Sequence, residues 1–338
     1  MGKNRLESNE LINSIKLLGR PQALLNGFAC DHSGTGFEIN GIFEGSVDIE
    51  IYTTKEKDGC DSVFFTAYID GQRAYDRCEA VVGLDVLRIE MPKDKNAHTL
   101  RIVKQTESNY NLCEIRAICF SGELLPLPDN KKKYVEYIGD SLSCGMGLLG
   151  KKGVEYPQTS RWEDVTRGYT YMSAQALDVD WSIVSESGIG LAGSWFDPLF
   201  DFYSAWSYKR DKDLKYDFAR VPDLLIINLG TNDFYLNCDL GICSLDELEQ
   251  KTKEFINFVR DSYNKQIPIL WVSRFMRVGN SYVEALDKAI ADMGGEDAKI
   301  FRLDVPTAAG GAQGHPDIEG HKVACDYVVN YVREKNLI

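Results

Sequence analysis

Apolar and polar positions follow two different periods along this chain, and the change of period comes near residue 125. Between residues 36 and 122 short runs alternate apolar and polar positions, with Asp58-Gly59 and Asp70-Gly71 as hairpin-type turns. Short strands at regular spacing, without helical stretches, predict a β-sandwich or jelly roll. The expected strands cover residues 37–43, 47–52, 63–69, 86–91, 98–104 and 112–120.

In the second half, apolar runs rich in β-branched residues alternate with stretches of helical period. Strands of this composition are typical of parallel sheets buried on both faces, and the order predicts a doubly wound α/β domain. In such sheets the reactive groups lie at the carboxyl ends of the strands. The expected strands cover residues 134–138, 181–185, 224–229, 267–273 and 299–303, and the helices 169–177, 245–263, 282–293 and 319–334.

The segment between the two patterns contains Pro126, Pro128 and three consecutive lysines, which is typical of a linker. We therefore predict an N-terminal β-sandwich over residues 1–125, a linker over 126–133 and an α/β domain over 134–338.

Charge and cysteine content narrow the classes of partner. The chain has 51 acidic and 38 basic residues, a net charge of −13, which argues against nucleic-acid binding. No apolar run approaches the roughly 18 residues of a membrane span, and the first residues lack a signal-peptide core, so we expect a cytoplasmic protein.

Nine cysteines without a CxxC pair indicate reduced thiols, and no histidine lies near Cys238 and Cys243 to complete a zinc site. We expect neither a metal nor a cofactor.

Three strand ends in the second domain carry candidate chemistry. The first strand ends in Gly139-Asp140-Ser141, which presents a serine at the start of a helix, where exposed N–H groups stabilise an oxyanion. The third strand leads into Asn232-Asp233, and His315 precedes the last helix. Taken singly, the serine and the asparagine are better explained as helix caps or turn residues. Together they place a serine, an amide and an imidazole at one sheet edge.

A glycine-rich stretch near the nucleophile resembles a nucleotide-binding motif. Residues 145–150 read formally as GxGxxG, and the same stretch is one residue short of a phosphate-binding loop. However, Gly145 lies seven residues beyond Ile138, and Lys152 stands where a magnesium-binding hydroxyl is required. We therefore do not expect a nucleotide site.

The ordered blocks resemble those of the SGNH hydrolases: Gly-Asp-Ser, a later glycine, Gly-x-Asn-Asp and His-Pro. Several stretches, together with the N-terminal β-sandwich, resemble carbohydrate esterase family 2, whose members are similar in deacetylating plant polysaccharides and oligosaccharides. The resemblance implies an SGNH, flavodoxin-like α/β domain and a serine carbohydrate esterase (a deacetylase of the acetylxylan esterase type) acting on acetylated carbohydrate. It implies Ser141 as nucleophile, His315 as base, and an oxyanion hole made of Ser141, Gly188 and Asn232. The matching stretches are residues 137–145, 187–190, 229–234 and 315–316, and in the N-terminal domain His98 and residues 104–107.

The chain departs from both families at the acid of the triad. SGNH enzymes usually carry Asp three residues before the histidine, and family 2 esterases often carry it two before; here these positions are Ala312 and Gln313. A backbone carbonyl at this point, such as that of Gln313, could orient the imidazole, because it accepts a hydrogen bond and so fixes Nδ1 as the protonated nitrogen. Asp304, at the end of the fifth strand, and more weakly Asp317 are alternative orienters.

Aromatic residues near the motifs are candidates for stacking on a sugar. Phe234 adjoins the asparagine block and is the preferred candidate, while Trp195 and Trp206 are at least as well explained as core or interface residues. Two other functions remain open: a general esterase or thioesterase for small esters, and a carbohydrate-binding protein with little catalysis.

Overall fold

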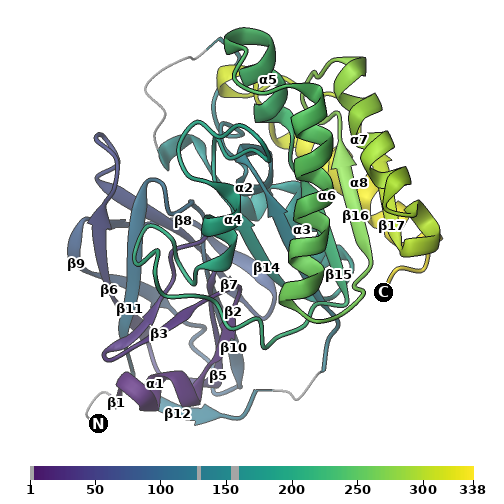
Figure 1. Cartoon of the computed structure of the whole chain (residues 1–338). Helices are drawn as coiled ribbons and strands as arrows, with labels where there is room; N and C mark the ends of the chain where they lie inside the picture. The colour runs from purple at the N-terminus through teal and green to yellow at the C-terminus, as the bar shows by residue number, and fades with distance from the viewer. Residues whose placement is uncertain (1–3, 128–130, 154–159) are drawn as a thin grey trace. The chain divides into compact units, whose positions relative to one another are not determined.

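The computed structural model consists of two units, and it describes residues 4–127, 131–153 and 160–338, apart from the side chains of residues 237–239 (Figure 1). The first unit is Met1–Lys131 with Thr159–Arg161, and the second is Lys132–Gln158 with Trp162–Ile338. The linker predicted over residues 126–133 contains residues 128–130, which lie outside the described residues.

The first unit is built from two antiparallel sheets. Their orders are β3-β4-β11-β6-β9, with β1 on β11, and β12-β5-β10-β7-β8, with β2 on β5. The sheet elements and the short helix are β1 (Asn4–Glu7), α1 (Ser8–Ser14), β2 (Lys16–Leu18), β3 (Gln22–Leu24), β4 (Gly27–Ala29), β5 (Gly36–Phe43), β6 (Ser46–Lys55), β7 (Ser62–Ile69), β8 (Gln72–Val81), β9 (Gly83–Glu90), β10 (His98–Lys104), β11 (Asn111–Phe120) and β12 (Gly122–Leu125).

Both sheets of this unit contribute to a single apolar core. Phe28, Ile49 and Ile115 of the first sheet and Phe37 and Phe65 of the second are all fully buried in one cluster. A shared core between two antiparallel sheets is the defining feature of a sandwich, so the predicted all-β architecture is confirmed.

The sequence pattern missed several strands of this unit. The structure adds β1 to β4, β8 and β12 and the helix α1 to the predicted set. Strand β8 carries charges at Arg73, Asp76, Arg77 and Glu79, and it forms one edge of its sheet. A strand with only one paired neighbour buries little of its surface, so the apolar alternation that identifies interior strands is weak there.

The second unit contains a five-stranded parallel sheet with the order β14-β13-β15-β16-β17. Its strands are β13 (Tyr134–Gly139), β14 (Asp180–Ser185), β15 (Leu224–Asn228), β16 (Ile269–Ser273) and β17 (Ile300–Asp304). The first four are almost entirely buried, as their β-branched sequences predict.

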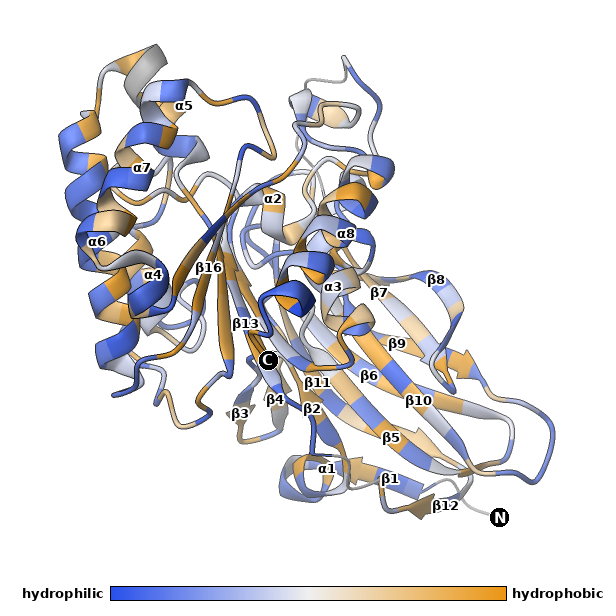
Figure 2. Ribbon diagram, turned by 90° about the vertical axis from the view of Figure 1, so that its right-hand side faces the viewer, coloured by the Kyte–Doolittle hydropathy of each residue, from blue (hydrophilic) through white to orange (hydrophobic). Residues whose placement is uncertain are grey.

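Helices cover both faces of this sheet, which gives the second unit three layers (Figure 2). One face packs against α4 (Leu199–Ser204), α5 (Thr231–Leu240), α6 (Leu245–Ser262) and α7 (Asn280–Asp292), and the other against α2 (Ser141–Cys144), α3 (Tyr169–Ala176) and α8 (Ile318–Glu334). The predicted doubly wound α/β domain is thus confirmed. The helix expected to start at Ser141 is α2, whereas the sequence pattern missed α4 and α5, which are short or lack a regular apolar stripe.

The strand order brings three strand ends together. Strand β13 lies between β14 and β15, so the chain leaves the sheet on both sides of the first strand. Such a switch point opens a crevice at the carboxyl ends of the strands. Residues 139–141, 185–188 and 228–232 follow those ends directly.

Two further features of the described residues concern the cysteines and the helices. The eight cysteines whose side chains are described are free thiols, and six of them are buried. None of the helices in the described ranges combines the length and the apolar character needed to span a bilayer.

Candidate active site

Ser141 is held at the start of α2 by the two residues before it. A side chain at Gly139 would collide with Ser143 Oγ, only 2.0 Å from the position of its Cβ. Asp140 caps the helix, because its carboxylate accepts a hydrogen bond of 2.9 Å from the N–H of Leu142. Ser141 is therefore the first residue of the helix, where N–H groups have no carbonyl partner within the helix.

His315 contacts the nucleophile directly. Its Nε2 lies 2.8 Å from Ser141 Oγ, which is the distance of a hydrogen bond that can pass a proton. The two residues are 174 positions apart in the sequence. The structure thus brings together the predicted nucleophile and the predicted base.

The loop that carries His315 rests on the glycines that resembled a nucleotide-binding motif. The N–H of Ala312 donates to the carbonyl of Gly147 at 2.9 Å. Gly147 has a φ of +78°, and a Cβ at Gly150 would lie 2.4 Å from Ala312 Cβ. These glycines allow two segments of the main chain to approach closely. Their contact sets the position of His315 relative to Ser141.

The environment of His315 favours the neutral imidazole. The ring is partly exposed to the cleft, yet the surrounding protein desolvates it enough to lower its pKa to about 4. The main-chain groups of Gln313 and Ala312 oppose this shift by favouring the protonated ring. Among the described residues no acceptor forms a full hydrogen bond with Nδ1. Gln313 has a positive φ of 55°, which turns the main chain just before the histidine.

The carboxylates considered as orienters are engaged elsewhere. Asp304 accepts hydrogen bonds of 2.6 Å from Ser273 Oγ and 2.5 Å from Arg302, and Arg274 lies 3.3 Å away. These donors lower the pKa of Asp304 against the opposing effect of its partial burial. Asp317 caps α8 by accepting from the N–H of Gly320. Among the described contacts neither carboxylate is bound to His315: the arginines pair with Asp304, and the start of α8 holds Asp317. Their role as orienters stays a prediction that no described contact supports.

The predicted oxyanion donors meet beside Ser141. Gly188 follows β14, has a φ of +84° and lines the same cleft. Asn232, in the first turn of α5, donates through Nδ2 to the carbonyl of Ile189 at 2.7 Å. Asn232 Nδ2 also lies 3.4 Å from a carboxylate oxygen of Asp140, the residue before the nucleophile. This second hydrogen bond is longer and therefore weaker than the one to Ile189.

Asp233 anchors the loop that carries Gly188, a role that the sequence did not suggest. Its buried carboxylate accepts three main-chain hydrogen bonds, from Leu191 at 2.9 Å, Ala192 at 2.6 Å and Gly193 at 2.9 Å. Burial raises the pKa of Asp233, while the N–H donors oppose that effect. The signal was present in the Asn232-Asp233 pair, but the distant backbone partners cannot be read from spacing.

A partly buried lysine joins the two ends of the same loop. Lys209 pairs with Glu186, at 3.3 Å, and with Asp197. These two acids stand at the start and the end of the loop, which residues 187–196 form between them. Within the loop, the N–H of Trp195 donates to the carbonyl of Gly188 at 2.9 Å. The ion pairs join the two ends of the loop, and the hydrogen bond from Trp195 fixes Gly188 within it.

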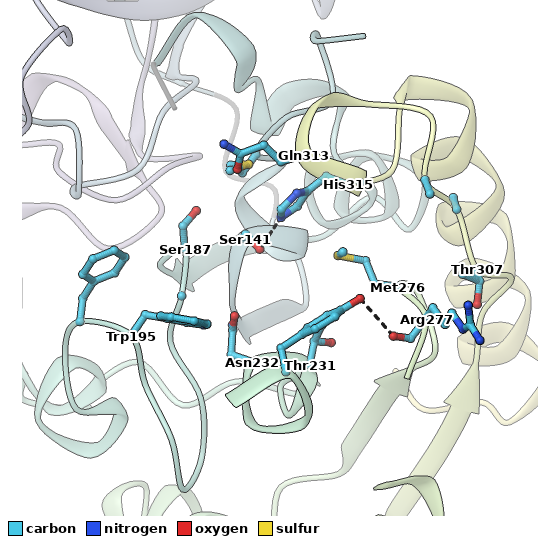
Figure 3. Close-up of a pocket in the computed structure, with 17 residues that line it drawn as sticks. Ser141, Ser187, Trp195, Thr231, Asn232, Met276, Arg277, Thr307, Gln313 and His315 are labelled. Carbon is cyan, nitrogen blue, oxygen red and sulfur yellow. Dashed lines mark hydrogen bonds between the residues drawn. The ribbon is translucent and has the colours of Figure 1, made fainter. Parts of the chain in front are cut away.

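Ser141 and His315 open into a cleft of about 570 Å³ (Figure 3). Trp195, which is 48% exposed, and Phe196 line it on one side. Its described lining contains one imidazole and no carboxylate, so a metal ion would find a single ligand there. The described lining residues are Ser141, Met146, Ser187, Gly188, Trp195, Phe196, Thr231, Asn232, Tyr235, Met276, Arg277, Thr307, Ala308, Ala309, Gln313, Gly314 and His315.

The aromatic residues differ from the prediction. Phe234 packs against the apolar core of the second unit and does not belong to the cleft lining, so its preferred status was wrong. The reason is helical rotation: Thr231, Asn232 and Tyr235 share one face of α5, and Phe234 lies about 100° from Tyr235. Trp195, the other aromatic candidate, does line the cleft, and its contact with a sugar stays a prediction.

His321, the second histidine of the C-terminal region, belongs to the core. It is fully buried, and its Nδ1 accepts a hydrogen bond of 3.1 Å from the N–H of Tyr169. The ring stacks on Tyr169 and meets the edge of Phe275. Burial lowers the pKa of His321 to about 3, so this residue stays neutral and packs α8 against α3.

The comparison with known families agrees with this geometry. The profile of the family described as GDSL-like Lipase/Acylhydrolase matches residues 135–328, a range that contains Ser141, Gly188, Asn232 and His315. The chain belongs to this family. The resemblance to SGNH hydrolases predicted from the ordered blocks is thereby confirmed.

Curated and solved relatives extend the likeness beyond the matched range. A cellulase/esterase, CelE, of Acetivibrio thermocellus is 27% identical over 327 residues, which cover 92% of this chain. The chain spans only 38% of the length of that relative. Among solved structures, a family two carbohydrate esterase from Clostridium thermocellum in complex with cellohexaose has a TM-score of 0.85 at 24% identity, covering 96% of this chain and 100% of that chain. An acetyl xylan esterase from Butyrivibrio proteoclasticus has a TM-score of 0.85 at 19% identity, covering 99% of both chains. The fold of both units is thus the fold of these esterases.

Proposed function

We propose that this chain is a serine esterase that removes acetyl or other small acyl groups from carbohydrates through a Ser–His dyad. The observation that carries the proposal is the 2.8 Å contact between Ser141 Oγ and His315 Nε2 at the base of the cleft. The names of its relatives, a cellulase/esterase and an acetyl xylan esterase, support the carbohydrate as substrate.

Acylation begins at the dyad. Ser141 Oγ attacks the carbonyl carbon of the ester while His315 Nε2 accepts the hydroxyl proton. The resulting oxyanion lies where the N–H groups of Ser141 and Gly188 and the amide of Asn232 converge. His315 then passes the proton to the departing sugar oxygen, the C–O bond breaks, and the acyl group stays on Ser141.

Deacylation repeats these steps with water. His315 takes a proton from a water molecule, the hydroxide attacks the acyl carbon, and the proton returns to Ser141 Oγ as the carboxylic acid leaves. Acylation and deacylation each begin with a neutral imidazole, and the low pKa of His315 supplies this form.

Main-chain groups take the place of the triad acid. Those of Gln313 and Ala312 favour the charged ring, whereas the carboxylates of Asp304 and Asp317 are bound to other partners. A neutral acceptor stabilises an imidazolium about half as well as a carboxylate does. We therefore expect a dyad with lower turnover than a complete triad, still assisted by the oxyanion donors.

Hydrolysis of nitrophenyl acetate by single variants tests this proposal. Ser141→Ala and His315→Ala should each lower kcat by roughly 10⁴-fold or more, since the residues act as one unit. Asp304→Ala should retain most of the activity. Full activity in either dyad variant would overturn the proposal, and a large loss in Asp304→Ala would restore the carboxylate as orienter.

Two further assays separate the alternative functions. A fluorophosphonate should label the wild-type protein at Ser141 and leave Ser141→Ala unlabelled; a wild-type protein without label would be a binding protein. Acetate release from acetylated xylo-oligosaccharides at a rate well above that from simple alkyl acetates would support the carbohydrate over a general ester.

A further inference from the structure

One side of the cleft carries a single permanent charge. Arg277 is the only Lys, Arg, Asp or Glu among the described lining residues, and its side chain is exposed. The whole chain has a net charge of −13, yet the described lining holds no carboxylate. A bound anion would therefore meet an attractive charge and no neighbouring acid in this cleft.

The guanidinium of Arg277 is not neutralised by the protein. Within the described ranges, no acid lies within ion-pair distance of it and its nitrogens make no hydrogen bond. Arg274, three residues earlier, shows the contrast: its guanidinium lies 3.3 Å from Asp304 and donates to Asn280. The two arginines share one loop, but only Arg277 has its donors available to a ligand.

The main chain beneath Arg277 is fixed on both sides. The carbonyl of Arg277 accepts a hydrogen bond of 3.3 Å from the hydroxyl of Tyr235, on α5. On the other side, Thr307 Oγ1 donates to the carbonyl of Arg274 at 2.7 Å, and the N–H of Ala308 donates to that of Phe275 at 3.0 Å. These hydrogen bonds fix the main chain of the loop that carries Arg277. Less conformational entropy is therefore lost when the guanidinium binds a ligand.

The position of Arg277 relative to the dyad defines what it can reach. In Figure 3 its side chain extends on the Thr307 side of the cleft, across the Ser141–His315 pair from Trp195. An acyl group on Ser141 leaves the rest of an oligosaccharide to lie along the cleft in these two directions. On one side, the aromatic rings can stack on a sugar. On the other side, the N–H groups of the Arg277 guanidinium can donate two parallel hydrogen bonds to a carboxylate.

We infer that Arg277 selects acetylated oligosaccharides that carry a carboxylate, that is, a uronic acid residue next to the acetylated sugar. This inference rests on the proposed esterase function and adds the charge of the substrate to it. The carboxylate binds the Arg277 guanidinium, and the acetylated neighbour lies at Ser141. Arg277 is a specificity residue and takes no part in the chemical steps.

Paired substrates test the inference. Acetate release is measured from an acetylated oligosaccharide with one uronic acid residue and from a neutral acetylated one of equal length. We expect the wild-type protein to prefer the acidic substrate, and Arg277→Gln to raise KM for it by roughly three- to tenfold, the range of a solvated charge-assisted contact, with kcat unchanged. Arg277→Lys should restore part of the preference, and 0.5 M salt should weaken it in the wild type alone.

A matched control removes the same charge elsewhere. Lys322→Gln, on α8 beside Glu319, lies outside the cleft lining and should leave both KM values unchanged. An equal change in both substrates for Arg277→Gln, or none in the acidic one, would overturn the inference while neutral deacetylation continued to support the esterase. A wild-type protein that cleaves nitrophenyl acetate but no acetylated sugar would overturn the carbohydrate assignment, and this inference with it.

Discussion

At the scale of single residues, the site depends on contacts that join distant parts of the sequence. The blocks around Ser141, Gly188, Asn232 and His315 could be predicted as neighbours because each follows a strand end or precedes a helix at the same sheet edge. The structure brings all four to the cleft, and their catalytic roles stay predictions. What orients His315 stays a prediction: a main-chain carbonyl was expected from the missing acid, and among the described residues no acceptor forms a full hydrogen bond with Nδ1.

The pH dependence of activity follows from His315. Desolvation disfavours its charged form and lowers its pKa to about 4, so the base stays neutral down to mildly acidic pH. We expect the acid limb of kcat/KM for nitrophenyl acetate to fall near pH 4, about two units below that of an ordinary histidine. A pH–rate profile between pH 3.5 and 8 measures it.

Unfolding in acid would also lower activity at low pH, so it must be distinguished from protonation of His315. Samples held at each low pH and returned to pH 7 should recover full activity if only the base was protonated. An acid limb at pH 6–7 with full recovery would contradict the expected environment of His315.

At the scale of elements, the loop of residues 187–196 is the part of the site held by the most specific contacts. Asp233 binds its centre, and Lys209 joins its two ends through Glu186 and Asp197. Periodicity identified the flanking strand β14 but not this loop, since its partners are main-chain N–H groups and buried ions. The same reasoning explains why Phe234 was misplaced: the rotation of α5 is set by packing, not by local sequence.

Asp233→Asn tests the positioning role of the anchor. An amide replaces one acceptor oxygen with a donor that faces main-chain N–H groups, so the loop shifts and Gly188 moves from the oxyanion. We expect kcat to fall about 10- to 100-fold, less than the full loss of an oxyanion donor, with KM nearly unchanged. Steady-state kinetics with nitrophenyl acetate separate the two constants.

A carboxylate at the opposite end of the sheet provides the control. Asp223 accepts a hydrogen bond of 2.9 Å from the N–H of Tyr134 at the start of β13, away from the dyad. Asp223→Asn should cost comparable stability and leave kcat intact. Equal loss of kcat in both variants would show that Asp233 acts on stability alone.

At the scale of the whole molecule, the two units can be followed separately. All five tryptophans, at positions 162, 181, 195, 206 and 271, belong to the second unit. Tryptophan fluorescence therefore reports unfolding of the α/β unit only. The division into two periodic patterns was readable from the sequence, because strand and helix periods differ, whereas the edge strands of the first unit were not.

Acid should destabilise the α/β unit through His321. Its folded pKa, about 3, lies below the 6.5 of the unfolded chain, so the unfolded state binds the proton first. Stability is full above pH 6.5 and falls as the pH decreases towards 3, by about 1.4 kcal/mol per pH unit within this window. Protonation would place a hydrogen on Nδ1 opposite the N–H of Tyr169, which now donates to it.

Urea unfolding at pH 7, 6 and 5, followed by tryptophan fluorescence, measures this slope. His321→Asn keeps an acceptor for the N–H of Tyr169 and removes the titration, so its free energy of unfolding should be lower at pH 7 but depend less on pH. An unchanged slope in this variant would assign the acid sensitivity to other groups.

The contact between Gly147 and Ala312 has a consequence for how such a site can diversify. It joins the segment after the nucleophile to the segment before the base, whereas the anchors of the loop with Trp195 and the hydrogen bonds beneath Arg277 involve other residues. The walls of the cleft can therefore be exchanged without disturbing the reactive pair. Transplanting the wall that carries Arg277 from a relative therefore offers a route to new substrate ranges at constant chemistry, whereas an exchange of the loop with Trp195 must also keep Gly188 in place.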